Sequence, residues 1–255
     1  MAAATTEPKA VSDKQLVKML ALMRDADSVE LKLTIPEDQQ RSAVMALGMD
    51  PLDGQIRLVY FLDTPDLKLN KHGLVVRARR VQRKGDDTVI KLRPVVPAEL
   101  SDELRDTSGF FVEVDAMPGG HVCSASLKGK PRKVSVRDAM SDGGPISRLY
   151  SKEQRRFFEA HAPEGIGLDD LTVLGPIFVV KLKSVPPGYD RDLVVELWLY
   201  PDGGRILELS TKCAPAEAFQ VAAEARAFLA ERGISTGGEQ TTKTRTALEF
   251  FSSDL

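Results

Sequence analysis

The chain has 255 residues, of which 42% are apolar and 28% are charged, so it carries ample apolar surface for a folded core. Its 35 basic and 37 acidic side chains give a formal net charge of -2. This balance excludes a global electrostatic attraction to nucleic acid or to an anionic membrane. A site for an anion must therefore be internal.

The cysteines and the N-terminus bear on the cellular compartment in which the protein is expected. Cys123 and Cys213 lie far apart, with no C-x-x-C motif and no histidine at zinc-ligand spacing, which favours free thiols in a reducing compartment and leaves a disulfide between them open. The first residues lack a basic start with an apolar core, and no run of about 18 apolar residues occurs. We expect a cytoplasmic protein with a tail and a short helix over 1–26 and one domain over 27–255.

The first half of the chain predicts two helices and a series of strands. Apolar residues at helical spacing favour a helix over 14–26 after a disordered stretch over 1–12, and a second helix over 41–48 ends at a glycine. Gly85 to Asp87 predicts a hairpin turn. The strands predicted from alternation are 29–35, 57–62, 74–81, 88–95 and 110–117.

The second half is interrupted by glycine and proline before it becomes regular again. Segments 124–128 and 133–136 predict a short hairpin, and a helix is predicted over 146–160, ending before Pro163. Strands follow at 177–185, 193–200 and 205–211, and the turn over 201–204 joins the last two as a hairpin. An alanine-rich helix over 215–232 ends at Gly233, and a polar stretch leads to a tail over 243–250.

Charged residues alternate with apolar ones along several of these strands, so each charged pair lies on one face of its strand. The pairs are Glu30-x-Lys32, Arg77-x-Arg79, Lys91-x-Arg93, Glu113-x-Asp115 and Lys181-x-Lys183. If the strands form one closed sheet, the charges line its interior and the apolar face meets outer helices. Taken singly, each strand also fits the solvated outer face of a sheet, and Lys181 and Lys183 also fit an edge strand guarded against aggregation.

Familiar catalytic motifs are missing from the sequence. It contains no Walker A loop, no G-x-G-x-x-G, no G-x-S-x-G and no H-E-x-x-H. The three histidines, His72, His121 and His161, are scattered, which argues against catalysis by histidine. Asp63 fits a turn or cap that orients the backbone before the arginine strand, and Tyr60 and Trp198 fit packing roles.

The order and spacing of the charged motifs resemble a known family over about residues 28–250. The matching features are Glu30-x-Lys32, Tyr60, Asp63-Thr64-Pro65-Asp66-Leu67, Gly73, Arg77-x-Arg79, Lys91 and Ile206-Leu207-Glu208. Together they resemble the CYTH domain of the triphosphate tunnel metalloenzymes. That family includes thiamine triphosphatases, inorganic triphosphatases and class IV adenylyl cyclases.

The resemblance implies an α+β fold, a closed antiparallel eight-stranded β tunnel with helices packed outside. It also implies catalytic roles for Glu30 and Lys32. Basic side chains would hold the phosphates, namely Lys32, Arg77, Arg79, Lys91, Arg93, Lys181, Lys183 and Lys243. Carboxylates would hold Mg²⁺ or Mn²⁺, namely Glu30, Glu113, Asp115, Glu196 and Glu208.

The sequence departs from the family pattern at two acidic positions. The family opens with Glu-x-Glu-x-Lys where this chain has Ser28, and it favours Glu-x-Glu near the end where this chain has Ser210. Serine is a weak, neutral ligand for a hard dication. The resemblance therefore implies retained anion binding with altered or lost hydrolysis.

Several functions follow as hypotheses. The first is a metal-dependent phosphohydrolase acting on tripolyphosphate, polyphosphate, or a nucleoside or thiamine triphosphate. The second is a non-catalytic sensor or scaffold that binds such an anion. A cyclase acting on ATP is less favoured because the sequence reveals no pocket for a base, and a β-sandwich interaction module fits only if the charged faces meet water.

Overall fold

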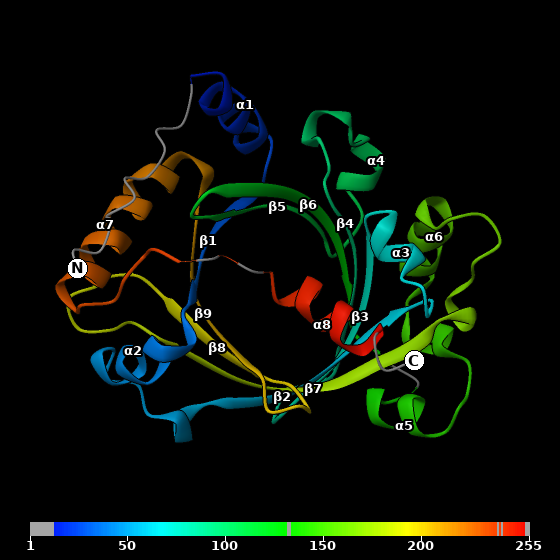
Figure 1. Cartoon of the computed structure of the whole chain (residues 1–255). Coiled ribbons are helices and arrows are strands. Elements are labelled where there is room, and N and C mark those ends of the chain that lie inside the picture. The colour runs from blue at the N-terminus through cyan, green and yellow to red at the C-terminus, as the bar shows by residue number, and fades with distance from the viewer. Residues whose placement is uncertain (1–12, 132–133, 239, 241, 253–255) are drawn as a thin grey trace.

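We analysed a computed structural model that describes residues 13–131, 134–238, 240 and 242–252. Nine strands close into a barrel in the order β1-β5-β6-β4-β3-β2-β7-β8-β9, and β9 pairs with β1 (Figure 1). The strands are β1 (Ser28–Ile35), β2 (Gln55–Asp63), β3 (Leu74–Val81), β4 (Asp87–Leu92), β5 (Phe110–Met117), β6 (Gly120–Gly129), β7 (Thr172–Ser184), β8 (Leu193–Leu199) and β9 (Arg205–Cys213).

The closed barrel with outer helices confirms the expected architecture, but the eight-stranded, wholly antiparallel form was wrong in two respects. The barrel has nine strands, and β1 and β5 run parallel with Ser28 opposite Glu113. The chain completes β2, β3 and β4 before β5 returns beside β1 in the same direction. The predicted hairpin of 124–128 with 133–136 was also wrong: β6 pairs with β5 and β4, residues 132–133 lie outside the described part, and a helix begins at Val136.

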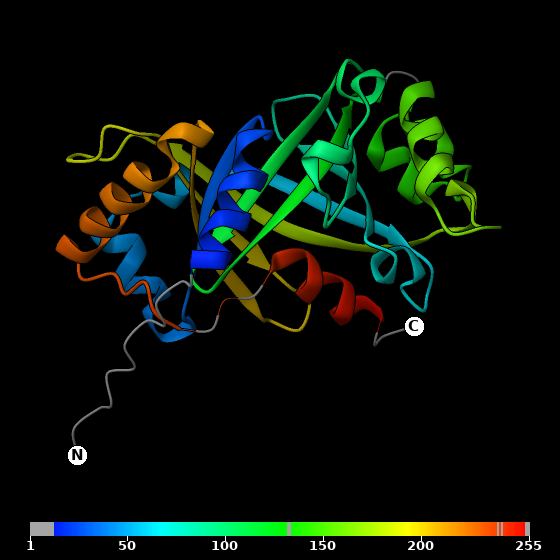
Figure 2. The same cartoon turned by 90° about the horizontal axis from the view of Figure 1, so that it is seen from above.

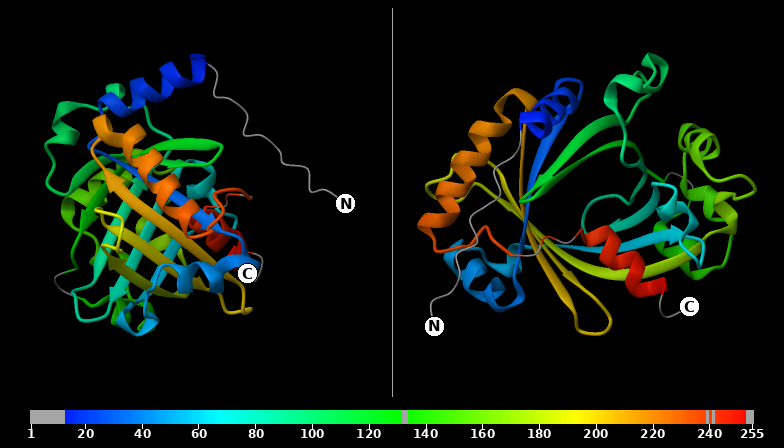
Figure 3. Two further views of the ribbon diagram at one scale, coloured as in Figure 1. Left: turned by 90° about the vertical axis from the view of Figure 1, so that its left-hand side faces the viewer. Right: turned by 45° about the horizontal axis from the view of Figure 1, so that its top comes forward.

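Helices cover much of the outer wall. The helices of the described chain are α1 (Asp13–Arg24), α2 (Gln40–Ala46), α3 (Lys68–Lys71), α4 (Asp102–Arg105), α5 (Val136–Ser141), α6 (Lys152–His161), α7 (Ala218–Glu231) and α8 (Lys243–Ser252), of which α8 lies at one end of the barrel (Figure 2). Figure 3 shows α7 lying over β8 and β9, where Phe228 and Leu229 pack against Leu207 and Leu209. On the other side, Phe157 and Phe158 of α6 pack against the outward residues of β3 and β4. Beneath these helices an apolar face of the strands thus points outward, as the alternation predicted.

The helix predicted over 146–160 forms as two pieces, and the tail over 243–250 is a helix. A 3-10 turn over Ile146–Leu149 is followed by α6, whose first turn is closed by a capping box between Ser151 and Gln154. Ser151 ends the first piece because its hydroxyl serves as the N-cap of the second. Both cysteines are buried and free, and no helix in the described ranges is long and apolar enough to span a membrane.

One end of the barrel is occupied by α8. In Figure 1 this helix lies within the outline of the barrel, and Figure 2 places it at one end of the strands. Ala247 and Leu248 are buried there against inward-facing apolar residues, among them Phe61 and Trp198. This apolar cluster fills the barrel beneath α8, so the charged part of the interior lies farther along the strands. Trp198 therefore packs, as predicted.

Asp63 orients the chain between β2 and the arginine strand β3. It is 1% exposed, and its carboxylate accepts hydrogen bonds from the backbone N–H groups of Thr64 (2.7 Å), Leu69 (2.9 Å) and Asn70 (2.9 Å). These bonds satisfy the donors at the start of α3, which confirms the cap role predicted for this residue.

We expect Asp63→Ala to lower the free energy of unfolding by about 2–4 kcal/mol, because three backbone donors lose their acceptor at a buried position. Urea denaturation measures this change. Asp53→Ala, at an exposed position in the turn before β2, is the control and should change stability by less than about 0.5 kcal/mol. Equal, small effects of both variants would contradict the cap role.

Candidate functional site

Strand register brings the charged residues predicted from the sequence into one interior. Glu30 lies opposite Asp115 across the parallel pair, and Lys32 lies opposite Ser210 on β9. On the other wall, Glu196 lies between Lys181 and Glu208. Parity alone thus placed these side chains on a common inner face.

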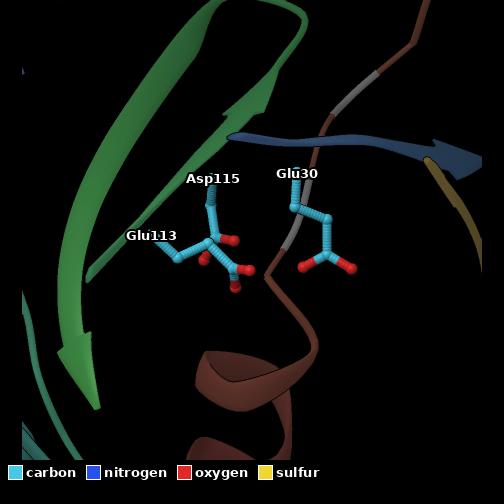
Figure 4. A group of neighbouring side chains, drawn as sticks. All are labelled: Glu30, Glu113 and Asp115. Carbon is cyan, nitrogen blue, oxygen red and sulfur yellow. The ribbon is translucent and has the colours of Figure 1, made fainter. Parts of the chain in front are cut away.

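Three carboxylates form an acidic cluster, which we define as Glu30, Glu113 and Asp115. Each offers an oxygen, and these oxygens all lie within 4.8 Å of one another. Figure 4 shows the three carboxyl groups converging, two from β5 and one from β1. Asp115 and Glu113 are buried, and Glu30 is half-buried. The cluster combines side chains that are more than 80 residues apart in the chain because β1 and β5 pair directly.

Ser28 and Ser210, the two positions at which the sequence departs from the pattern it resembles, lie at this acidic cluster. The Ser28 hydroxyl donates a hydrogen bond of 3.2 Å to Glu113, and the Ser210 hydroxyl donates one of 3.2 Å to Glu30. Each serine therefore approaches a different carboxylate from a neighbouring strand. A longer acidic side chain at either position would point into the same cluster.

Lysines neutralise the acidic cluster. Lys32 Nζ lies 3.0 Å from Glu30 and 2.8 Å from Asp115, and Lys91 Nζ lies 3.4 Å from the other oxygen of Asp115. Lys212 forms an ion pair with Glu113. Burial opposes the charge on Asp115, but Lys32 and Lys91 outweigh it and lower the pKa of that carboxyl to about 2. The same carboxylates outweigh burial at Lys32 and raise its pKa.

The other two carboxylates proposed as metal ligands, Glu196 and Glu208, lie apart from the acidic cluster. Lys243, at the start of α8, forms ion pairs with both, at 2.7 Å to Glu208, and Lys181 Nζ lies 3.1 Å from Glu196. Burial opposes ionisation of Glu196, but Lys243 and Lys181 outweigh it and hold the pKa of that carboxyl well below its usual range. The five predicted carboxylates thus form two groups, each with its own lysines.

The two arginines of β3 differ in their partners. Arg79 makes a bidentate pair with Asp87 at 2.8 and 2.9 Å. Within the described residues, no carboxylate lies within ion-pair distance of Arg77, and its buried Nε has no hydrogen-bond partner. Burial, with a further contribution from Arg79, lowers the pKa of Arg77 to about 9. Arg77 is therefore a half-buried cation with a buried, unsatisfied Nε and no carboxylate in direct contact within the described residues.

Arg93 and Lys183 lie at the margins of the charged interior. Arg93 contributes to an open groove of about 340 Å³ beside the end of β4, and burial lowers its pKa. Lys183 is 57% exposed at the end of β7 and pairs with Asp192 at 2.8 Å. The structure thus brings the predicted cations together with the exception of Lys183, whose partner is the exposed Asp192.

The sequence reading missed four charged residues that reach this interior. Arg57 lies opposite Val179 on the inner parity of β2, and Lys212 and Lys128 contact the same ring, that of Phe111. Asp87 binds Arg79. Lys212 could have been found by its parity with Glu208 and Ser210, whereas Lys128 lay in a segment whose strand was predicted only in part.

The described interior carries an excess of positive charge. Six carboxylates face it, those of Glu30, Asp87, Glu113, Asp115, Glu196 and Glu208. The basic side chains that face it are Lys32, Arg57, Arg77, Arg79, Lys91, Arg93, Lys128, Lys181, Lys212 and Lys243. Such an interior repels itself when empty, and a polyanion would relieve the repulsion.

The acidic cluster fits a hard divalent cation. Mg²⁺ and Mn²⁺ prefer oxygen ligands, and Mg²⁺ commonly keeps several waters beside one or two carboxylates. Three converging carboxylate oxygens meet that requirement. Lysines pair with the same carboxylates, so a cation would compete with Lys32 and Lys212 for them.

Comparisons with known proteins agree on the fold. No protein-family model and no curated protein matches this chain. A "putative adenylate cyclase" from Bacillus halodurans has a TM-score of 0.59 at 13% identity, over 86% of this chain and 97% of that one. A "putative adenylyl cyclase" from Hippeastrum, HpAC1, described as revealing a dominant triphosphatase activity, has a TM-score of 0.58 at 18% identity, over 87% of this chain and 95% of that one. This chain therefore has the fold of these two proteins, which confirms at the level of the fold the resemblance drawn from the sequence.

Proposed function

We propose that this protein binds the triphosphate group of a small phosphorylated anion inside the barrel and hydrolyses it with a divalent cation. The observation that carries the proposal is Arg77, a half-buried side chain whose buried Nε has no hydrogen-bond partner and which has no carboxylate within ion-pair distance in the described chain. Leaving a charged donor unsatisfied costs free energy that a phosphate oxygen would recover. The triphosphatase activity described for the Hippeastrum protein of the same fold supports the reaction class.

The arginines and the lysines would bind the phosphates in different ways, because their charged groups differ in shape. Arg77 and Arg79 would bind equatorial phosphate oxygens through planar forks, while Lys91 and Lys181 act as point charges. Their field would stabilise the charge that grows on the phosphoryl oxygens as the bond to the leaving group breaks. Glu30, Glu113 and Asp115 would hold Mg²⁺ or Mn²⁺, which when bound supplies further charge neutralisation on the phosphate oxygens. Lys32 would orient the reacting phosphate at that cluster, and Glu30 would contribute there by holding Lys32 and the cation in place.

A second candidate function is non-catalytic binding of the same anion, as a sensor or scaffold. It is favoured by Ser28 and Ser210, which stand against the acidic cluster where the family pattern has carboxylates. It is also favoured by the ion pairs of Lys32 and Lys212, which already satisfy these carboxylates. In this version the cations hold the ligand and no phosphate is released.

The test is a paired measurement of binding and turnover on the full chain. Tripolyphosphate, ATP and thiamine triphosphate are titrated by calorimetry and followed by thermal unfolding, because a ligand of the native state raises the melting temperature. Release of phosphate and of pyrophosphate is then followed with Mg²⁺, with Mn²⁺ and with neither.

Each outcome assigns one function. Binding with metal-dependent phosphate release supports the hydrolase, and binding without release supports the sensor. Release of pyrophosphate from ATP would support a cyclase instead. If millimolar tripolyphosphate neither binds nor shifts the melting temperature, the anion-binding proposal is wrong.

A further inference from the structure

Phe111 is an aromatic residue on the charged side of the barrel wall. It shares the parity of Glu113 and Asp115 on β5, whereas Val112 and Val114 point outward into an apolar cluster. The ring is half-buried. Among the described residues, it belongs to none of the four apolar clusters of the fold, unlike Phe61 and Trp198, which pack beneath α8. An apolar ring in such surroundings contributes little to the core.

Two lysines surround this ring. Lys128 Nζ lies 3.9 Å from the centroid, within the range of a cation–π contact, and Lys212 Nζ lies 5.8 Å from it. Lys212 also pairs with Glu113, so the ring lies one side chain away from the acidic cluster. Lys128 has no carboxylate within ion-pair distance in the described chain, and burial together with Lys212 lowers its pKa. Lys128 is exposed, so its ammonium is free to move from the ring to an incoming phosphate.

We infer that Phe111 is a stacking platform for a flat heteroaromatic ring carried by the triphosphate, so that the ligand is an organic triphosphate. The inference rests on the function proposed above. A phosphate oxygen gives Lys128 a stronger partner than the ring does, and the face of Phe111 then becomes available. A heteroaromatic ring stacks on that face while its phosphates extend toward Arg77 and Arg79.

The groove beside Arg93 is the competing location for an organic group. It is lined by Asn70, Lys71, His72, Gly73, Leu92, Arg93, Pro94 and Val95. This lining offers hydrogen bonds and charge, but its single aromatic side chain is the exposed His72. Phe111 combines an aromatic face with direct contact to lysines of the charged interior, so it is the better platform.

The test compares ligands with and without a ring. ATP, thiamine triphosphate, methyl triphosphate and tripolyphosphate are titrated by calorimetry against the native chain, Phe111→Leu and Phe111→Trp. Phe178→Leu is the matched control, because Phe178 is 37% exposed on the outer wall of β7. The native chain should bind ATP or thiamine triphosphate at least about 5-fold more tightly than methyl triphosphate, the scale of one stacked ring. Which of the two binds more tightly identifies the heterocycle.

The variants should distinguish the contribution of the ligand's ring to the affinity from that of its phosphates. Phe111→Leu should weaken binding of the preferred ring-bearing ligand by about 5- to 20-fold and leave tripolyphosphate within about 2-fold, while Phe111→Trp keeps both. Equal affinity of the native chain for methyl triphosphate and both ring-bearing ligands would overturn the inference, even if Phe111→Leu failed to fold. Tight binding of tripolyphosphate in that experiment would leave the proposed function standing, whereas no binding of any ligand would overturn both.

Discussion

Arg77→Met should lower the affinity for tripolyphosphate by about 2–3 kcal/mol, or roughly 30- to 150-fold, while leaving the ligand-free protein as stable as before or slightly more stable. Both effects have one cause. The native side chain is half-buried, its buried Nε lacks a hydrogen-bond partner, and no carboxylate pairs with it in the described chain, so the ligand-free fold carries a desolvation cost that a bound phosphate would relieve. Methionine fills a similar volume and carries no charge. Calorimetric titration and urea denaturation measure the two quantities.

Arg80→Met is the matched control, since Arg80 is the next residue of β3 and is exposed on the outer face. It should change neither quantity by more than about 0.5 kcal/mol. Arg79→Met should weaken binding as well, but at a cost in stability, because it leaves Asp87 without its bidentate partner. If Arg77→Met binds tripolyphosphate as well as the native chain does, Arg77 does not contact the anion and the proposed function loses its main support.

The inner face of the barrel was largely predictable because strand parity is a local property. Arg77 and Arg79, or Glu113 and Asp115, share a face whatever the strands pair with, so two-residue spacing was enough to identify them. The cap at Asp63 was predictable for the same reason, since its acceptors and donors lie within seven residues. The pairing of β1 with β5 was not, because no local pattern indicates which distant strand returns alongside.

The grouping of the carboxylates shows where sequence spacing stops being informative. Glu30, Glu113 and Asp115 converge, but Glu196 and Glu208 have the same strand parity and lie with Lys243 instead. Which carboxylates meet depends on register around the whole barrel, a non-local quantity. Lys243 could be assigned only by family resemblance, because the helix that carries it was read as a tail. Its two ion pairs fix the start of that helix at the charged interior.

The two serines contact only one of these two groups of carboxylates. Ser28 and Ser210 each donate a hydrogen bond to a member of the acidic cluster, and within the described residues neither donates one to Glu196 or Glu208. The departures from the family pattern therefore fall together on one candidate metal site. Within the described residues, neither serine makes a hydrogen bond with Arg77 or Arg79, the arginines proposed to bind phosphate. We therefore expect that metal binding can be changed at the serines while anion binding at these arginines is kept.

The double variant Ser28→Glu, Ser210→Glu should bind Mn²⁺ at least about 10-fold more tightly than the native chain, because it adds two hard oxygen ligands to the three carboxylates already within 4.8 Å of one another. Without metal, the added like charges should lower the free energy of unfolding by about 1–3 kcal/mol, and Mn²⁺ should restore it. Calorimetric titration with Mn²⁺ and thermal unfolding with and without the metal measure both effects. Metal-dependent release of phosphate from tripolyphosphate should rise as well if the native site is limited by metal affinity.

Ser42→Glu with Ser184→Glu is the control, because it makes the same change in net charge at exposed positions away from the interior. It should leave Mn²⁺ affinity unchanged. A folded Ser28→Glu, Ser210→Glu variant with no gain in Mn²⁺ affinity over this control would mean that the acidic cluster holds lysines and not a metal, which would favour the non-catalytic function.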